Sequence, residues 1–256
     1  MSLRSCLALS IAMLLPLAAQ ADLTTYTQNF NGMNTADSGL GPNDLSNNGW
    51  LVGANVFDAA GNFQYNYFSF PAPNGGAAFS AVATGNGGPN QAPNYVNIYS
   101  DYNNADQGSG SYIDALVFQE QTIGTDDLGT TATFTFDYLK NPDASANFQD
   151  TTTFAWVKVL DSVGGSFATL GVTEFETTAA STTTWAEGQS IDLVIDSAWD
   201  GQLLQFGFRS YTTNFNDSGI FYDNLTFSNA SAIPEPASAM LIGLGCVGFG
   251  LRRRRK

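Results

Sequence analysis

Ala132-Thr-Phe-Thr-Phe-Asp-Tyr-Leu139 is the stretch that decides the fold class. In an extended chain its side chains point alternately to two faces. One face takes Ala132, Phe134, Phe136 and Tyr138, and the other takes Thr133, Thr135 and Asp137. Such alternation is typical of an antiparallel strand with one buried and one solvated face. The stretch therefore predicts a β-sheet protein.

Similar runs recur through the chain, separated by clusters of Gly, Asn, Asp and Thr. They are Leu23 to Phe30, Phe63 to Phe70, Tyr95 to Tyr99, Ile113 to Gln119, Phe154 to Leu160, Ile191 to Ile195, Leu203 to Tyr211 and Gly219 to Phe227. No stretch of ten residues between them has helical spacing. We predict an all-β, two-sheet antiparallel sandwich of the jelly-roll type, formed by residues 22–230 as one domain.

The first 21 residues have the organisation of a secretory signal peptide. A cationic start at Arg4 precedes an apolar core from Cys6 to Leu17, and Ala19-Gln20-Ala21 is a small-x-small cleavage pattern. We expect a signal helix over residues 1–21 and cleavage before Asp22. The mature protein is then exported.

The last segment, residues 231–256, has three parts: Pro234-Glu235-Pro236, an uncharged apolar run from Ala237 to Leu251, and a basic end from Arg252 to Lys256. The prolines prevent a helix from entering the run from the preceding domain. A helix of fifteen residues is about 22 Å long, shorter than the roughly 30 Å hydrocarbon core of a bilayer. We expect a marginal transmembrane helix with its C-terminus held in the cytoplasm by the cations.

This order of parts resembles the PEP-CTERM sorting segment of exported bacterial proteins. The residues that carry the resemblance are Pro234, Glu235, Pro236, Arg252, Arg253, Arg254 and Arg255. The resemblance implies recognition and removal by an exosortase, a membrane protease, and coexistence with exopolysaccharide in a Gram-negative bacterium. An ordinary anchor that is never processed is the alternative. Both interpretations place the domain in the cell envelope or outside the cell.

The composition of the domain excludes several classes of function. Both cysteines lie outside residues 22–236 and the chain has no histidine, which excludes disulfides, thiolate metal sites and histidine-dependent catalysis there. Residues 22–236 contain 23 acidic residues against three cations, Lys140, Lys158 and Arg209, a formal charge of −20. Such a surface repels phosphate backbones, so we expect no nucleic-acid partner.

Asp223 is the polar exception in the last predicted strand, Gly219 to Phe227. Phe221, Asp223, Leu225 and Phe227 are two residues apart, so in a regular strand they point to the same face. Since the three apolar side chains are expected to face the core, the pattern predicts that the Asp223 carboxylate points there as well. A buried carboxylate is unfavourable unless it is paired or coordinates a cation. A structural Ca²⁺ bound by Asp223 is one solution, because the domain is rich in hard oxygen ligands. Hydrogen bonds to backbone amides at the sandwich rim are the other.

The Tyr222-Asp223-Asn224-Leu225 end of this strand, with an N-terminal Gln28-Asn29-Phe30-Asn31-Gly32, resembles the jelly rolls of carbohydrate-binding modules. In those modules a structural calcium commonly joins the first and last strands. The resemblance implies carbohydrate binding and assigns Asp223 and Asn31 to the calcium site. Asn31 replaces the usual acidic residue.

Carbohydrate binding requires aromatic side chains that stack on sugars. Ala155, Val157 and Val159 are expected to form a core face, which leaves Phe154, Trp156 and Lys158 on the opposite face of their strand. The candidate stacking residues are Trp156, Tyr67, Tyr65 and Trp50. The alternative for each is a place in the hydrophobic core.

Glu174 and Glu176 are the one carboxylate pair that suggests hydrolysis, since residues i and i+2 of a strand are about 7 Å apart, within reach of inverting glycosidase chemistry. Such pairs arise by chance in so acidic a domain, and we assign no catalytic residue. We therefore expect an exported, noncatalytic envelope or matrix protein that binds carbohydrate or exopolysaccharide. A purely structural matrix or biofilm protein is the alternative, and a glycoside hydrolase is less favoured.

Overall fold

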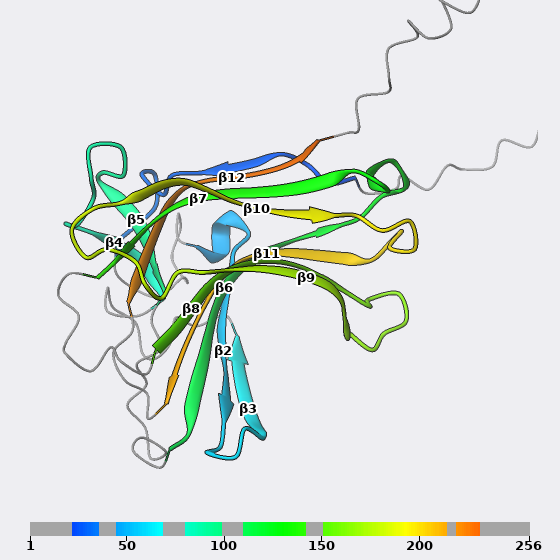
Figure 1. Ribbon diagram of the computed structural model, residues 1–256, viewed down its shortest axis with the longest axis horizontal. Helices are drawn as coiled ribbons and strands as arrows, with labels where there is room; N and C mark the ends of the chain where they lie inside the picture. The colour runs from blue at the N-terminus through cyan, green and yellow to red at the C-terminus, as the bar shows by residue number, and fades with distance from the viewer. Residues whose placement is uncertain are drawn as a thin grey trace, which may run out of the picture.

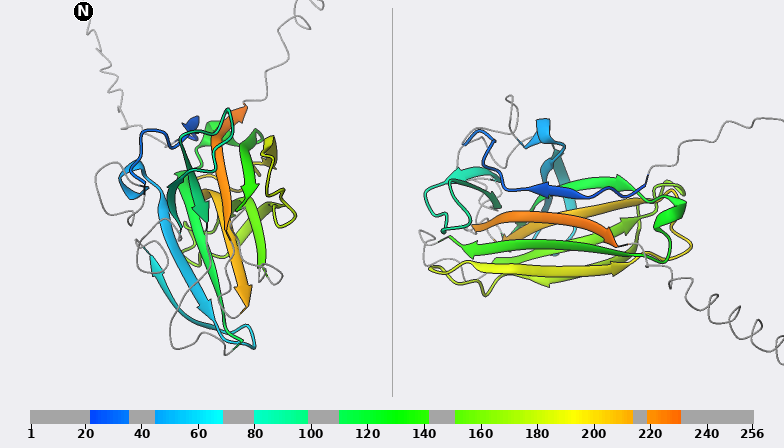
Figure 2. Two further views of the ribbon diagram at one scale, coloured as in Figure 1. Left: turned by 90° about the vertical axis from the view of Figure 1, so that its left-hand side faces the viewer. Right: turned by 90° about the horizontal axis from the view of Figure 1, so that it is seen from above.

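The structure is a computed structural model that describes residues 22–35, 45–68, 80–98, 110–141, 151–213 and 219–230. These residues form two antiparallel β-sheets packed face to face, with two short 3₁₀ helices, η1 (Ser46–Asn48) and η2 (Thr125–Asp127). Figure 1 shows β7, β10 and β12 in one layer and β6, β8, β9 and β11 in the other, and Figure 2 shows the layers from two further sides. The predicted all-β class is confirmed.

None of the helices in the described ranges is long and apolar enough to cross a membrane. The predicted signal helix and the predicted helix from Ala237 to Leu251 both lie outside the described residues.

The first sheet, sheet A, contains the strand that decided the fold class. Its order is β10 (Ala186–Val194), β7 (Thr131–Lys140), β12 (Ile220–Ala230), β5 (Asn94–Ile98) and β4 (Ala81–Thr84). β1 (Tyr26–Gln28) pairs with the second half of β12, from Leu225 to Phe227. β12 is therefore a central strand with neighbours on both sides.

The second sheet, sheet B, also has six strands in the described part of the chain. Its order is β3 (Phe63–Phe68), β2 (Leu51–Phe57), β6 (Tyr112–Thr122), β11 (Leu203–Thr213), β8 (Thr151–Leu160) and β9 (Thr169–Glu176). β2 and β3 lie at the bottom of Figure 1, with β6 beside β2. One face of sheet B packs on sheet A, and the other is the outer face.

The core between the sheets is aromatic. Phe134 and Phe136 are fully buried there, as the alternation in β7 predicts. Phe206 stacks on Phe227 with ring centroids 4.2 Å apart, and Phe208 stacks on Tyr222 at 3.7 Å. Each pair joins a strand of sheet B to a strand of sheet A. Burying an aromatic side chain contributes about 1.5–3 kcal/mol, so these rings carry much of the stability of the sandwich.

Nine predicted runs coincide with strands, although the first is shortened to β1. The predicted runs do not include β2, β4 or β9 (Thr169–Glu176). β2 has buried residues at consecutive positions, Val52, Gly53 and Ala54, and so lacks the alternation of a half-buried strand. β4 is four residues long, too short for a periodic signal.

A β-bulge in β12 overturns the predicted orientation of Asp223. The register with β7 shifts between Asp223 and Thr226, and Asn224 adopts a positive φ of 51°. An extra residue in a strand exchanges the two faces beyond it. Tyr222 before the bulge and Leu225 after it both point into the core. Asp223 therefore points to the outer side of sheet A, and the prediction that it shares a face with Leu225 is wrong.

Candidate functional site

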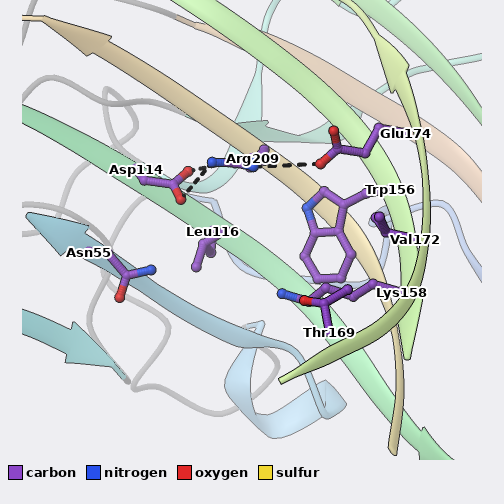
Figure 3. A pocket seen from close by; sticks show the side chains of 9 residues that line it. All are labelled: Asn55, Asp114, Leu116, Trp156, Lys158, Thr169, Val172, Glu174 and Arg209. Atoms are coloured by element: carbon purple, nitrogen blue, oxygen red, sulfur yellow. Dashed lines mark hydrogen bonds and ion pairs between the residues drawn. The ribbon is translucent and has the colours of Figure 1, made fainter. Parts of the chain in front are cut away.

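The outer face of sheet B carries a groove with a cavity of about 210 Å³. It crosses the strands β2, β6, β11, β8 and β9 (Figure 3). The residues that line it are Asn55, Asp114, Leu116, Trp156, Lys158, Thr169, Val172, Glu174 and Arg209. Phe154, Trp156 and Lys158 lie on the outer face while Ala155, Val157 and Val159 are buried in the core, as predicted.

The floor of the groove is apolar because a glycine leaves space for large neighbours. Gly207 on β11 is the register partner of Phe118 on β6 and of Trp156 on β8. The Phe118 and Trp156 rings meet over it with centroids 5.6 Å apart, and Leu116 packs against them. A Cβ atom at Gly207 would lie 2.3 Å from the carbonyl oxygen of Val117, so the position admits no side chain.

Arg209 holds two carboxylates at one end of the groove. Its Nε and one terminal nitrogen donate to the two carboxylate oxygens of Asp114 at 3.1 and 3.0 Å. The other terminal nitrogen lies 3.5 Å from Glu174 Oε1. Burial raises the pKa of Asp114, and the neighbouring guanidinium opposes that rise. Bidentate pairing of this kind fixes both side chains in orientation as well as charge.

Lys158 lies at the other end of the groove from this pair (Figure 3). Its Nζ is 4.3 Å from the centroid of the Trp156 ring, a cation–π contact. Burial lowers the pKa of this ammonium, and the charge of Asp114 opposes that effect. Among the described residues, no carboxylate forms an ion pair with Lys158.

Trp156 connects the two ends of the groove. Its side chain is only 2% exposed, and its indole Nε1–H has no hydrogen-bond partner among the described residues. Figure 3 shows that nitrogen on the edge of the ring that faces Asp114 and Arg209. Buried indole nitrogens usually find an acceptor, as those of Trp50 and Trp185 do, so this donor is an exception.

Aromatic rings flank the charged end of the groove. Phe57 stacks on Tyr112 with centroids 4.9 Å apart, and Tyr112 contacts Tyr211 at 5.9 Å. Phe154 lies beyond Tyr211, and Arg209 packs over both rings. Because these rings pack on one another, they support Arg209 and give a sugar few free ring faces.

The four predicted stacking residues do not converge. Trp156 lines the groove, but Trp50 lies in the core, 1% exposed, with Nε1 donating to the Tyr26 hydroxyl at 2.8 Å. The Trp50 ring is therefore unavailable to a sugar. Tyr65 is 37% exposed on β3, paired with the core-facing Val56 and so on the opposite face from Trp156. Tyr67 is also on β3, and its side chain lies outside those described.

Asp223 is fully buried at the outer side of sheet A. Its Oδ1 accepts a hydrogen bond of 2.7 Å from the Asn224 amide, and its Oδ2 has no partner among the described residues. Burial raises the pKa of Asp223 to about 7, with a smaller contribution from the charge of Asp137, while the Asn224 amide lowers it. Asp137 is its register partner on β7.

The oxygens around Asp223 are mostly engaged. Asp137 accepts hydrogen bonds from Gln91, Asn224 and the Gly188 amide at 2.7–2.8 Å. Asn31 Oδ1 accepts from the Asn94 amide at 3.2 Å.

Calcium takes six to eight oxygen ligands. The described residues hold no group of three His, Cys, Asp or Glu side chains that could bind a metal ion. The geometry supplies one free carboxylate oxygen, on Asp223, and a calcium site built from Asp223 and Asn31 stays a prediction.

Glu174 and Glu176 share one face of β9, as the sequence predicts, and it is the exposed face. Glu174 is ion-paired with Arg209, and Glu176 is the register partner of Phe154. The sequence did not indicate Asp114, Arg209 or Gly207 as site residues. One signal was present, because Lys158 and Arg209 are two of only three cations in residues 22–236.

Comparison with known proteins identifies the C-terminal segment. Residues 232–255 match the model of the PEP-CTERM protein-sorting motif, which contains Pro234, Glu235, Pro236 and Arg252 to Arg255. The chain therefore carries this sorting motif, and the motif indicates a secreted protein that is transiently anchored through its C-terminus. No curated protein matches the sequence.

Solved structures of similar fold include carbohydrate-binding modules. A module in complex with β-1,4-galactotriose is 16% identical, with a TM-score of 0.32, over 59% of this chain and 81% of that one. A carbohydrate-binding module of the β-sandwich superfamily is 15% identical, with a TM-score of 0.29, over 80% and 86%. A cyclase from Fischerella sp. TAU in complex with 4-(1H-indol-3-yl)butan-2-one is 16% identical, with a TM-score of 0.44, over 81% and 96%.

Proposed function

We propose that this protein is an exported carbohydrate-binding protein and that the groove on the outer face of sheet B is its binding site. One observation carries the proposal: the indole N–H of Trp156 is buried in the groove without a partner. A saccharide supplies hydroxyl and ring oxygens that accept such a hydrogen bond. Its apolar C–H face fits the apolar lining residues Leu116, Trp156 and Val172.

The remaining lining groups support the same ligand class. Asn55 and Thr169 provide neutral donors and acceptors on opposite sides of the groove, on β2 and β9. Arg209, Asp114 and Glu174 form a preorganised network whose polar atoms are already oriented. A small number of fixed polar groups around an apolar floor is the usual composition of a small-molecule site.

We further propose that the protein is noncatalytic. Acid–base catalysis by two carboxyls requires one that gives a proton and one that receives it. Both carboxylates of the groove, Asp114 and Glu174, are ion-paired with the same Arg209. Because one guanidinium engages both carboxylates, neither is free to exchange a proton with a ligand in the groove.

The sorting motif supports a proposal for how the protein is processed and where it is delivered. An exosortase would recognise Pro234-Glu235-Pro236 and the arginines, remove the segment and release the domain to the envelope or the extracellular matrix.

The strand connections support the jelly-roll assignment, because the chain alternates between the two sheets from β5 to β8 and from β9 to β12.

Replacing Trp156 with phenylalanine tests the proposed site, since it keeps an aromatic ring on the floor and removes the N–H donor. We expect about ten-fold weaker binding, the loss of one hydrogen bond from a desolvated site. The measurement is isothermal titration of the full chain in detergent micelles with acidic and neutral oligosaccharides.

Trp185→Phe is the matched control, because the Trp185 indole donates to the Asn86 carbonyl at 3.1 Å, away from the groove. We expect this variant to bind as tightly as the parent. Equal affinities of the Trp156→Phe variant and the parent would contradict the proposed site. Absence of any saccharide ligand would favour a structural matrix protein.

A structural calcium at Asp223 and Asn31 is a second proposal, supported by the unpartnered Oδ2 of Asp223. A cation there would compensate a buried charge. The test is the melting temperature at pH 8 with calcium and with chelator. A higher melting temperature in calcium that is lost in Asp223→Asn would support the proposal, and identical melting temperatures would end it.

The titration of Asp223 gives a separate prediction for the chelator-treated protein. Its pKa is raised from 3.8 to about 7 in the folded state, so folding favours the protonated form. The stability that this proton contributes is complete below pH 3.8 and is lost as the pH rises through 7. We expect the melting temperature of the parent to fall between pH 6 and pH 8, and that of Asp223→Asn to fall less.

Asp126→Asn is the control for this pH series, because Asp126 is an exposed carboxylate in η2. It should retain the pH dependence of the parent. The same slope in Asp223→Asn and in the parent would show that another group is responsible.

A further inference from the structure

The distribution of cations in this domain is uneven. Residues 22–236 have three cations against 23 acidic residues, and two of the three, Lys158 and Arg209, line the same groove. The charges of the four ionic residues in the groove cancel, with Asp114 and Glu174 opposing the cations. In a domain of formal charge −20, this neutral groove offers two cations to an anionic group.

The two cations of the groove have different partners. Arg209 is ion-paired with Asp114 at 3.0 Å and with Glu174 at 3.5 Å. Lys158 has no ion pair among the described residues, and its Nζ rests over the Trp156 ring at 4.3 Å. A partly buried ammonium without a counter-ion is costly, because desolvation penalises its charge.

Two donors in the groove therefore await a partner: the buried indole N–H of Trp156, on the ring edge that faces Asp114 and Arg209, and the Lys158 ammonium, which lies over the same ring at the other end of the groove. The Trp156 N–H requires a hydrogen-bond acceptor, and the Lys158 ammonium requires an acceptor that is negatively charged. A carboxylate has two oxygens that accept charge-assisted hydrogen bonds and neutralises the ammonium. A sugar hydroxyl satisfies the indole but leaves the charge of Lys158 uncompensated.

Resting on the proposed carbohydrate-binding function, we infer that the ligand is an acidic saccharide whose uronate carboxylate is bound by Lys158. The net charge of the domain repels such a ligand at long range, but salt screens this repulsion beyond about 8 Å at physiological ionic strength. The contact between carboxylate and ammonium lies within that distance. Local pairing in the groove therefore decides the preference.

The test compares uronic acid oligosaccharides with the same oligosaccharides after reduction of each carboxyl to a primary alcohol. The probes are oligogalacturonate, oligoglucuronate and oligomannuronate, titrated into the full chain in detergent micelles at 150 mM salt. We expect the parent to bind at least one acidic probe about ten-fold or more tightly than its reduced counterpart. Lys158→Met keeps the length of the side chain and should bind both members of that pair equally.

Two controls accompany this variant. Lys140→Met removes a cation of sheet A that does not line the groove and should keep the preference. Lys158→Arg keeps the charge and should keep it as well. A melting curve for each variant verifies that it is folded.

The outcomes separate the inference from the proposed function. Equal binding of acidic and reduced probes by the parent would overturn the inference and leave carbohydrate binding intact. A preference that survives in Lys158→Met would also overturn it, because the carboxylate would then be bound elsewhere. No binding of either member of any pair would contradict both the inference and the proposed function.

Discussion

Replacing Arg209 with methionine is expected to lower the free energy of unfolding by about 3 kcal/mol. The arginine pairs with Asp114, whose side chain is 8% exposed, and with the more exposed Glu174. Methionine fills a similar volume but leaves the carboxylate of Asp114 buried without a counter-ion. Chemical denaturation at pH 7 measures the loss. It should shrink as the pH falls, because a protonated Asp114 no longer requires the guanidinium.

The double variant Asp114→Leu/Arg209→Met distinguishes an unpaired charge from a packing defect. Replacing both members of a buried ion pair with apolar residues is often neutral. We therefore expect the double variant to recover most of the stability that Arg209→Met loses. Equal losses in the single and double variants would show that packing of Arg209 against Phe154 and Tyr211, rather than its charge, stabilises this end of the groove.

The substitution Gly207→Ala is expected to be as destabilising, by about 3 kcal/mol. The added Cβ would lie 2.3 Å from the Val117 carbonyl oxygen and 2.6 Å from Phe118 Cα. Both are backbone atoms of the neighbouring strand, so the sheet itself must move. For a domain of this size the melting temperature should fall by about 6–12 °C. The floor of the groove is displaced with it, and saccharide binding should weaken.

Gly32→Ala is the matched control, because no atom lies within 4 Å of a Cβ at that position. The alanine removes backbone freedom from the unfolded chain and should leave the melting temperature unchanged or slightly raised. If Gly207→Ala behaves like Gly32→Ala, the close approach of β6 and β11 does not set the shape of the groove.

The fold class was predictable because alternation is a local property of each strand. Phe134 and Phe136 take the core face that the pattern assigns to them. The orientation of Asp223 was not predictable, because it depends on the bulge at Asn224. A bulge exchanges the faces to which the following side chains point, and no residue pattern in this sequence indicates it. β2 escaped the list of predicted strands because both of its faces are covered.

The groove was predictable only in part. Trp156 was identified from its place opposite a core-facing run, which is again a local property. Asp114, Gly207 and Arg209 lie on β6 and β11 and meet Trp156 only through the register of three strands. Trp50 has the same composition signal as Trp156, but lies in the core. The different positions of Trp50 and Trp156 result from pairing between strands that are distant in the sequence, which no local pattern specifies.

The indole resonances of the tryptophans test the central claim most directly. In a proton–nitrogen correlation spectrum of the full chain in micelles, assigned with Trp→Phe variants, the Trp156 Nε1–H should shift downfield when an oligosaccharide is added, because it gains an acceptor. The indoles of Trp50 and Trp185 already donate to Tyr26 and Asn86 and should not move. A saccharide that binds without shifting the Trp156 resonance, or that shifts Trp185 instead, would contradict the assignment of the groove as the binding site.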